Sequence, residues 1–253
     1  MNTMTDTATT PAAALATFRE RRERAVAQPL GSLALTTTQW VDSEQQIWGV
    51  PGTWAPLPVG ESGLRLTARA ADSIRVNGEL VDGTVTVAGK DSDNPGSIVF
   101  SDTQQGFVIA GPAGYALRVW DAQSDAIANF GGIAAFDHNP DWVVPARFTE
   151  TPGATMPFEH IKDDEARETE IPGVISFTKD GVDYSLAAIK SGRALQVVFS
   201  DATSGETTYS VGRFLFVAPD ADGNVTLDFN HAVLPPCAFS YAFNCPMPPK
   251  QNR

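Results

Sequence analysis

Residues 175–189, ISFTKDGVDYSLAAI, decide the fold class of this chain. Apolar and polar side chains alternate on either side of Asp180-Gly181, and a period of two is typical of a half-buried strand. An Asp-Gly pair between two extended runs favours a two-residue type I′ turn. The stretch therefore predicts a β-hairpin.

Short extended runs separated by turn residues continue this pattern on both sides of the hairpin. Asn77-Gly78 and Asp82-Gly83 repeat the two-residue turn signal. Strands about 8–12 residues apart are typical of sandwiches and barrels, and nothing long and helical separates them here. We expect a mostly β fold, an antiparallel β-sandwich or a barrel-like structure. The expected strands are 33–39, 63–70, 73–81, 84–89, 97–102, 106–111, 115–121, 194–201, 207–219 and 224–230.

One α-helix is expected at the N-terminus, over residues 11–28. Pro11 opens a run rich in Ala, Leu, Glu and Arg, which are good helix formers, and Gly31 lies just beyond it. Its four arginines have no aromatic or glycine residues between them, which indicates a docking helix rather than a nucleic-acid-binding arm. Residues 1–10 are polar and are expected to form a disordered tail.

Residues 29–253 are predicted to form a single large β-rich domain. The stretch 151–172 is rich in charge, Pro and Gly, and it is either a subdivision of this domain or a long connection inside it. All-β domains of about 200–250 residues are common, which favours the connection. The chain is long enough to bury a core without a disulfide framework or a metal.

The charge balance excludes some classes of partner. The chain has 18 Lys and Arg against 30 Asp and Glu, a net charge of −12, and this field repels nucleic acid and anionic membranes. No apolar run reaches the length of about 18 residues that a transmembrane helix needs. The apolar stretch 12–16 is too short for a signal peptide, so a cytoplasmic location is expected. The oligomeric state is left open.

Common catalytic signatures are missing from the sequence. There is no GxSxG, HExxH, GxxxxGK[ST], GxGxxG or EF-hand loop. Cys237 and Cys245 have neither CxxC spacing nor a neighbouring Cys/His cluster, so no zinc site is predicted. We expect no metal and no cofactor, and we assign no catalytic residue.

The last sixty residues concentrate polar side chains on predicted strands. Arg213 lies in an apolar strand and must face solvent or be paired, and Asp201 or Asp228 is its expected partner. A carboxylate, an amide and an imidazole follow one another at a strand end, where they would orient a polar ligand or satisfy the backbone. The candidate ligand-binding residues are Arg213, Asp228, Asn230, His231, Tyr209, Asp201 and Thr203.

The same region carries a resemblance to a known family. DATSGETTYSVGR at 201–213 is followed by DFN at 228–230, PPCAF at 235–239 and CPMPP at 245–249. This ordered pattern resembles the bacterial family catalogued as domain of unknown function 1684. The resemblance implies a shared fold and a bacterial origin, and it brings no activity with it. The matching residues are Asp201, Thr203, Gly205, Thr208, Tyr209, Gly212, Arg213, Asp228, Phe229, Asn230, Pro235, Cys237, Ala238, Phe239, Cys245, Pro246, Pro248, Pro249 and Asn252.

The resemblance also bears on the two cysteines. Relatives that look exported would hold the pair in an oxidising compartment, where a Cys237–Cys245 bridge would stabilise the fold by about 2–3 kcal/mol. In a reducing cytoplasm both would remain thiols. We expect the two residues to lie close together.

Three classes of function remain open. The favoured one is a small-molecule-binding β-domain, with Arg213, Asp228 and Asn230 as polar contacts in an aromatic-lined pocket. The second is a hydrolase-like enzyme that uses Asp228, His231 and Tyr209. The third is a structural or interaction protein in which the motif residues only hold the fold.

Overall fold

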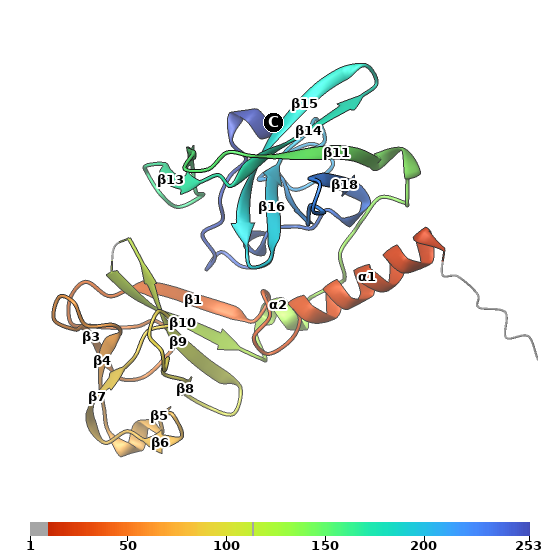
Figure 1. Cartoon of the computed structure of the whole chain (residues 1–253). Coiled ribbons are helices and arrows are strands. Elements are labelled where there is room, and N and C mark those ends of the chain that lie inside the picture. Colours follow the sequence, from red (N-terminus) through yellow and green to blue (C-terminus); the bar gives the residue numbers. More distant parts are fainter. Residues whose placement is uncertain (1–9, 113) are drawn as a thin grey trace, which may run out of the picture. The chain divides into compact units, whose positions relative to one another are not determined.

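The computed structural model describes residues 10–112 and 114–253, so residues 1–9 of the expected disordered tail lie outside the described residues. Figure 1 shows antiparallel β-sheets and one long N-terminal helix. The predicted mostly β fold class is confirmed.

The contacts within the chain divide it into two compact units. The C-terminal unit consists of the described residues up to Glu23, Gly132–Ala238 and Asn244–Arg253. The N-terminal unit consists of Arg24–Gly131 and Phe239–Phe243. Each unit therefore contains a segment from the opposite end of the sequence.

The N-terminal unit is built from two antiparallel sheets. One has six strands in the order β1-β10-β9-β8-β5-β6, and the other has four in the order β2-β3-β4-β7. Alternating strand residues bury a core that includes Trp54, Leu66 and Val108. Its elements are β1 (Leu35–Trp40), β2 (Gln45–Gln46), β3 (Thr53–Pro56), β4 (Leu64–Ala68), η1 (Ala70–Asp72), β5 (Arg75–Val76), β6 (Glu79–Leu80), β7 (Gly83–Val87), β8 (Ile98–Val99), β9 (Gln104–Gly111), β10 (Gly114–Asp121) and α2 (Asp125–Ala128).

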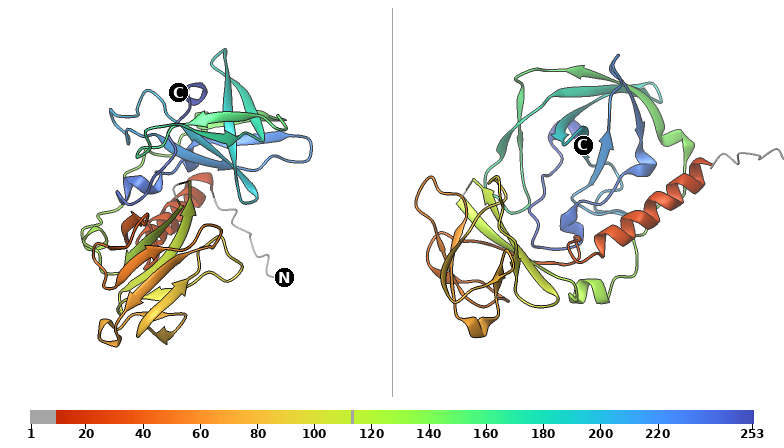
Figure 2. Two further views of the ribbon diagram at one scale, coloured as in Figure 1. Left: turned by 90° about the vertical axis from the view of Figure 1, so that its left-hand side faces the viewer. Right: turned by 60° about the horizontal axis from the view of Figure 1, so that its bottom comes forward.

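The C-terminal unit is a curled half-barrel. Its six-stranded antiparallel sheet has the order β17-β16-β15-β14-β11-β18, and β12 and β13 form a separate pair. Figure 2 shows the curvature of this sheet. The inner face carries a second core that includes Ile175, Val197 and Leu227. The elements are η2 (Pro140–Trp142), β11 (Val143–Glu150), β12 (Thr155–Phe158), β13 (Arg167–Glu170), β14 (Gly173–Lys179), β15 (Val182–Ser191), β16 (Ala194–Phe199), β17 (Arg213–Val217), β18 (Asn224–Asp228), η3 (Phe229–His231), η4 (Pro236–Ala238) and η5 (Lys250–Asn252).

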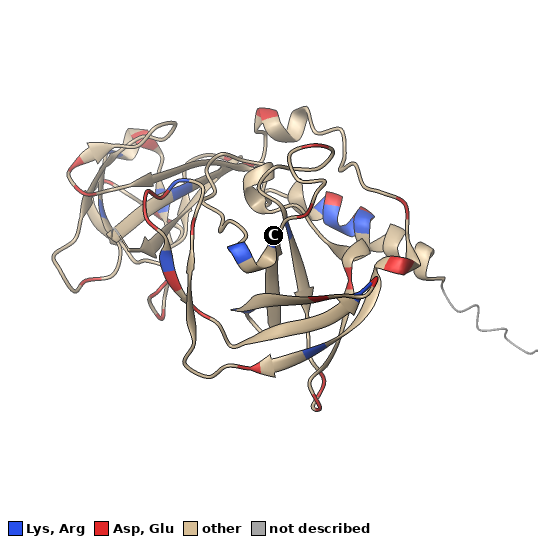
Figure 3. Cartoon of the chain, turned by 90° about the horizontal axis from the view of Figure 1, so that it is seen from above, with Lys and Arg blue, Asp and Glu red and all other residues tan. Residues whose placement is uncertain are grey.

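Helix α1 (Pro11–Val26) lies close to the predicted range 11–28. Its residues up to Glu23 dock on the C-terminal unit. Arg19 donates a hydrogen bond to the carbonyl of Phe136 (2.7 Å), and Glu23 accepts one from the backbone of Ile133 (2.8 Å). The charged residues of the helix all lie at 19–24, where four arginines are interspersed with two glutamates (Figure 3). Among residues 10–112 and 114–253, no helix is both long and apolar enough to span a membrane.

Two of the three predicted two-residue turns form hairpins. Asp180 and Gly181 join β14 to β15 with φ values of 52° and 77°. Asn77 and Gly78 join β5 to β6 with φ values of 53° and 88°. Positive φ at both positions is the signature of the type I′ turn.

The third turn prediction, at Asp82-Gly83, is wrong as a hairpin. β7 pairs with β4 in the four-stranded sheet, whereas β6 pairs with β5 in the six-stranded sheet. The turn therefore carries the chain from one sheet to the other. A dipeptide sets the local backbone angles, but it does not choose the strand's partner.

The junctions between the two units lie near residues 23 and 131 rather than at 151–172. The stretch 151–172 contributes the β12–β13 hairpin inside the C-terminal unit. It is a connection within that unit. Whether the two units fold together as the single domain predicted over 29–253 stays a prediction.

Asn252 fills a gap in the half-barrel. β15 pairs with β16 only over Ile189–Ser191, and beyond that point the Asn252 side chain lies between the two strands. It accepts a hydrogen bond from the Ala187 N–H (2.8 Å) and donates to the carbonyls of Ala187 (2.9 Å) and Val198 (2.8 Å). Asn252 is 2% exposed. The amide side chain of Asn252 thus takes the place of direct backbone pairing between Ala187 and Val198.

We expect Asn252→Ala to lower the free energy of unfolding by about 2–4 kcal/mol, because it leaves buried backbone groups of Ala187 and Val198 without partners. Urea denaturation followed by circular dichroism measures the change. Gln251→Ala is the matched control, because its exposed side chain makes one hydrogen bond, to Ser185. It should stay within about 0.5 kcal/mol of the unsubstituted protein. Equal effects of the two substitutions would contradict the role of Asn252.

Candidate functional site

Arg213 forms an ion pair with Asp201, one of its two predicted partners. Its Nη2 donates to Asp201 Oδ2 (2.5 Å) and to Thr203 Oγ1 (3.2 Å). Arg213 is the first residue of β17 and lies opposite Phe199, the last residue of β16. The predicted pairing of Arg213 is confirmed.

The loop between β16 and β17 is shaped to bring Asp201 back to Arg213. Asp201 Oδ1 accepts hydrogen bonds from the backbone N–H (2.9 Å) and the hydroxyl (2.6 Å) of Thr203, which closes an Asx turn. Gly212 has a φ of +89°, and a Cβ there would lie 2.2 Å from the Phe199 carbonyl oxygen. Only glycine fits this approach to β16.

Burial of Asp201 favours its protonated form, but other contacts outweigh burial. The hydrogen bonds from Thr203 and the charge of Arg213 stabilise the carboxylate, so the pKa of Asp201 is lowered. The group is therefore ionised at neutral pH and its charge compensates that of Arg213.

Asp228, Asn230 and His231 form a second polar cluster where β18 ends. Asp228 Oδ1 accepts from the backbone N–H (3.0 Å) and the side-chain amide (2.8 Å) of Asn230 and so caps the 3-10 helix η3. Asp228 Oδ2 lies 2.9 Å from His231 Nδ1. Asn230 also exchanges hydrogen bonds with the backbone of Asn139 (2.8 and 2.9 Å). The cluster ties β18 to the segment before β11.

The pKa of Asp228 is also lowered. Burial alone would raise it, but the hydrogen bonds from Asn230 and the contact with His231 have the larger combined effect. Asp228 is thus an ionised cap that also orients the imidazole of His231. The ring of His231 packs edge-on against Phe18 of α1, with centroids 4.8 Å apart.

Tyr209 lies beside the cysteines. Its hydroxyl donates to the Cys237 carbonyl (3.3 Å), and the Cys237 backbone N–H lies 3.3 Å from Cys245 Sγ. The predicted proximity of Cys237 and Cys245 is confirmed, and both side chains are buried thiols. The described part of the chain holds no group of three or more His, Cys, Asp or Glu side chains suited to a metal ion.

A row of aromatic rings connects the two polar clusters. Phe199 and Phe229 have ring centroids 5.4 Å apart, and the guanidinium of Arg213 lies 5.2 Å from the Phe199 centroid. Phe229 contacts Trp142 (5.9 Å) and Phe177 (6.1 Å) in turn. Phe177 stacks on Tyr184 at 5.0 Å. We name Trp142, Phe177, Tyr184, Phe199 and Phe229 the aromatic cluster.

The aromatic cluster lies at one rim of the half-barrel. Neighbouring strands are antiparallel, so the ends of β14, β16 and β18 meet the starts of β15, β17 and β11 there. Alternation places Arg213 on the same inner face as Leu215 and Val217, which are core residues. On the inner face of β17, the charged residue Arg213 is thus followed by the apolar residues Leu215 and Val217.

Two rings of the cluster are open to solvent. Trp142 is 46% exposed and Tyr184 is 45% exposed, although each packs on a neighbouring ring. The Nζ of Lys179 lies 4.9 Å from the Trp142 ring centroid and 3.2 Å from the carboxylate of Asp180. The rim therefore carries two half-exposed aromatic residues, and Trp142 lies beside the Lys179–Asp180 ion pair.

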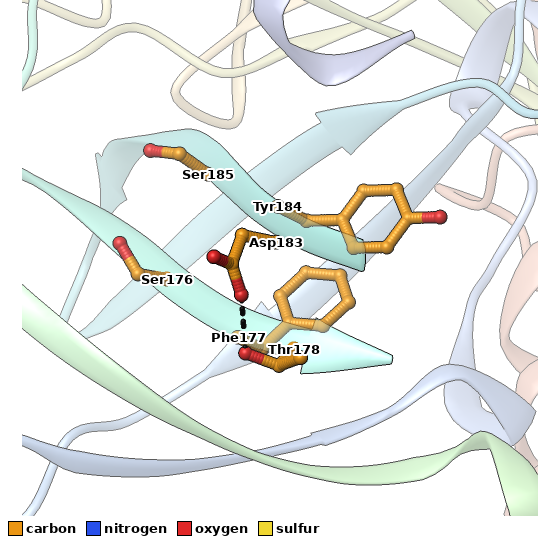
Figure 4. Close-up of a pocket in the computed structure, with 6 residues that line it drawn as sticks. All are labelled: Ser176, Phe177, Thr178, Asp183, Tyr184 and Ser185. Atoms are coloured by element: carbon orange, nitrogen blue, oxygen red, sulfur yellow. Dashed lines mark hydrogen bonds between the residues drawn. The ribbon is translucent and has the colours of Figure 1, made fainter. Parts of the chain in front are cut away.

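A hollow of about 450 Å³ lies on the β14–β15 hairpin. Figure 4 shows its lining, in which Phe177 and Tyr184 lie against each other and Thr178 donates a hydrogen bond to Asp183 (2.6 Å). Ser176 and Ser185 complete it. Two members of the aromatic cluster thus also border a hollow with polar side chains.

Comparison with known proteins identifies the family. Residues 128–253 match the model of the family described as "Protein of unknown function (DUF1684)". The chain belongs to this family. The match covers both polar clusters and the aromatic cluster.

One similar solved structure is a solution NMR structure of an uncharacterized protein from Haloarcula marismortui. The two sequences are 35% identical over 49% of this chain and 72% of that one, with a TM-score of 0.40. The bacterial origin expected for this DUF1684 protein stays a prediction. A search of curated proteins found no match.

The DUF1684 residues predicted from the sequence divide into separate groups. Arg213, Asp201 and Thr203 form one, and Asp228, Asn230 and His231 form another. Tyr209 contacts Cys237. Sequence reasoning did not select Lys179 or the members of the aromatic cluster as candidate site residues, and of the cluster it named only Phe229, as part of the family pattern. The alternation in 175–189 was the available signal, because it places Phe177 and Lys179 on one face of β14.

We expect Arg213→Ala to lower the free energy of unfolding by about 1–3 kcal/mol. Arg213 is 15% exposed and Asp201 is 44% exposed, so the cost falls between those of surface and buried ion pairs. Urea denaturation measures it. Arg193→Ala, at an exposed position in the β15–β16 turn, is the control and should change stability by less than about 0.5 kcal/mol. If Arg213→Ala lowered the free energy of unfolding by less than about 0.5 kcal/mol, the Arg213–Asp201 ion pair would not be stabilising.

Lowering the pH should weaken the ion pair between Arg213 and Asp201. Because the pKa of Asp201 is lowered in the folded state, its stabilising effect is complete above the unfolded value of about 3.9 and is lost as pH falls through the folded pKa. The stability difference between the unsubstituted protein and Asp201→Asn should therefore shrink between pH 6 and pH 3 in urea titrations. Asp164→Asn, at an exposed position, should show no such convergence. A constant Asp201→Asn difference would refute the assignment.

Proposed function

We propose that this protein binds a small molecule at the rim of the half-barrel. The ligand has a planar apolar part and an anionic group. The observation that carries the proposal is the aromatic cluster, whose rings Trp142 and Tyr184 are nearly half exposed although they are continuous with the core. Exposed apolar surface of this kind marks binding sites.

The charges beside the cluster support an anionic group on the ligand. Lys179 lies over Trp142, and the side chain of its counterion Asp180 is largely exposed to solvent. Arg213 stacks on Phe199 at the other side of the cluster. Aromatic faces with a few polar groups that fix orientation are typical of small-molecule sites.

The polar motif residues act as positioning residues in this proposal. Asp201 and Thr203 fix the Arg213 side chain. Asp228 caps the turn that carries Phe229. The ligand contacts Trp142 and Tyr184 rather than the caps.

An enzyme that uses Asp228, His231 and Tyr209 is a weaker proposal. The contact between Asp228 and His231 (2.9 Å) orients the imidazole as a general base requires. The Tyr209 hydroxyl, however, donates to the Cys237 carbonyl, and Asp228 also caps a helix. These contacts favour positioning over catalysis.

The test uses three matched probe sets: planar aromatic carboxylates, their neutral amides, and aliphatic carboxylates. Ligand-observed NMR and thermal shift should detect the aromatic carboxylates first. Trp142→Ala should weaken their binding about 10–100-fold, as loss of a central aromatic contact does. Trp48→Ala is the control, because Trp48 is 75% exposed in the N-terminal unit, and it should bind like the unsubstituted protein.

Lys179→Ala tests the charge separately. It should reduce binding of the aromatic carboxylates to the level of their amides and leave the amides unaffected. The proposal fails if no probe binds the unsubstituted protein at millimolar concentration, or if Trp142→Ala and Trp48→Ala bind equally well. Circular dichroism confirms that each variant is folded.

A further inference from the structure

The chain leaves the C-terminal unit once more near its end. After Ala238 it contributes Phe239–Phe243 to the N-terminal unit, and it returns at Asn244. Within the N-terminal unit, the Ser240 hydroxyl donates to the Leu35 carbonyl (2.5 Å). The ring of Phe243 lies 5.3 Å from the guanidinium of Arg118. The excursion is therefore held at its far end.

Cys237 and Cys245 flank the segment 239–243 that belongs to the N-terminal unit. We call this segment the excursion, and we call the place where the chain leaves and re-enters the C-terminal unit, between Cys237 and Cys245, the neck. One lies just before the chain leaves the C-terminal unit, and the other lies just after it returns. They are eight positions apart, and the Cys237 N–H lies 3.3 Å from Cys245 Sγ. Both side chains are buried. The neck is thus closed by contact between two cysteines.

Backbone contacts in the C-terminal unit hold each cysteine in place. The Cys237 carbonyl accepts from the Tyr209 hydroxyl (3.3 Å), and the Cys245 carbonyl accepts from the Ile161 N–H (3.2 Å). Two residues after Cys245, the Met247 N–H donates to the Glu159 carbonyl (2.7 Å). The cysteines therefore face each other from fixed backbone positions.

We propose that Cys237 and Cys245 are a site of oxidative modification and form an intrachain disulfide that closes the neck. This inference is independent of the proposed ligand site. A disulfide between Cys237 and Cys245 would enclose residues 238–244 in a covalently closed loop. The two cysteines could then not move apart.

The reaction balances with a disulfide oxidant such as glutathione disulfide. The Cys237 thiolate attacks one sulfur of the oxidant, whose S–S bond breaks and releases one glutathione thiolate. The Cys245 thiolate then attacks the Cys237 sulfur of the mixed disulfide and releases the second glutathione. Two protein thiols lose two protons and two electrons, and the oxidant becomes two thiols.

The surroundings of Cys237 favour it as the attacking group. Its hydrogen bond with Cys245, with a further contribution from Tyr209, overcomes the effect of burial and lowers the pKa of the Cys237 thiol to about 7. A substantial share of thiolate at neutral pH speeds thiol–disulfide exchange.

The test refolds the reduced full chain in two buffers, one with excess glutathione disulfide and one with dithiothreitol. Refolding lets the oxidant reach the thiols before they are buried. Samples are then denatured, alkylated with N-ethylmaleimide and weighed by mass spectrometry. After the oxidising buffer we expect no alkylation, no glutathione adduct and a monomer lighter by two hydrogens. A peptide map should show Cys237 joined to Cys245. After dithiothreitol we expect two alkylated cysteines.

Cys237→Ser and Cys245→Ser are the matched controls. Each should retain one thiol, which is alkylated or carries one glutathione. The oxidised unsubstituted protein should melt about 5–10 °C above its reduced form, and the serine variants should show no such difference. Two alkylated cysteines, stable glutathione adducts or linked dimers from the unsubstituted protein in the oxidising buffer would overturn the proposal.

Discussion

The half-barrel depends on one buried amide, that of Asn252. β15 pairs with β16 only over Ile189–Ser191, so that backbone groups on the facing edges of the two strands beyond this stretch have no partner in the other strand. The side chain of Asn252 satisfies Ala187 and Val198 on the two sides of this split. The backbone carbonyl of Asn252 also accepts a hydrogen bond from the Ser200 N–H (3.0 Å), next to Asp201. The position of Asp201, and with it that of Arg213, thus follows from how the split is filled.

The family signature describes a scaffold more than a set of reacting groups. Asp201 closes an Asx turn and Asp228 caps a 3-10 helix. Gly212 permits a close approach to β16. Trp142 and Tyr184, which are among the exposed large apolar residues, belong to neither cap. The residues of the family pattern thus form caps and turns at the ends of strands. In a curled sheet such contacts fix the direction in which the chain leaves each strand.

Local features of this chain were predictable from its sequence. The alternation in 175–189, the type I′ turns and the Arg213–Asp201 pair all depend on neighbouring residues or on the cost of burying a charge. The partner of β7 was not predictable, because Asp82-Gly83 sets backbone angles and not the sheet that the next strand joins. The aromatic cluster was missed for a similar reason, since it gathers rings from five separate segments. The role of Asn252 depends on the separation of β15 from β16, and this separation leaves no recognisable pattern in the sequence around Asn252.

The exchange of segments between the two units has a consequence for synthesis on the ribosome. The first part of α1 belongs to the unit whose other residues begin at Gly132, so it emerges long before its partners. At about 5–20 residues per second, the delay is on the order of ten seconds. During that interval Leu15, which is buried in the folded chain, is exposed on a nascent polypeptide. Chaperones that bind emerging chains therefore meet the apolar side chain of Leu15 before the residues that cover it have been made.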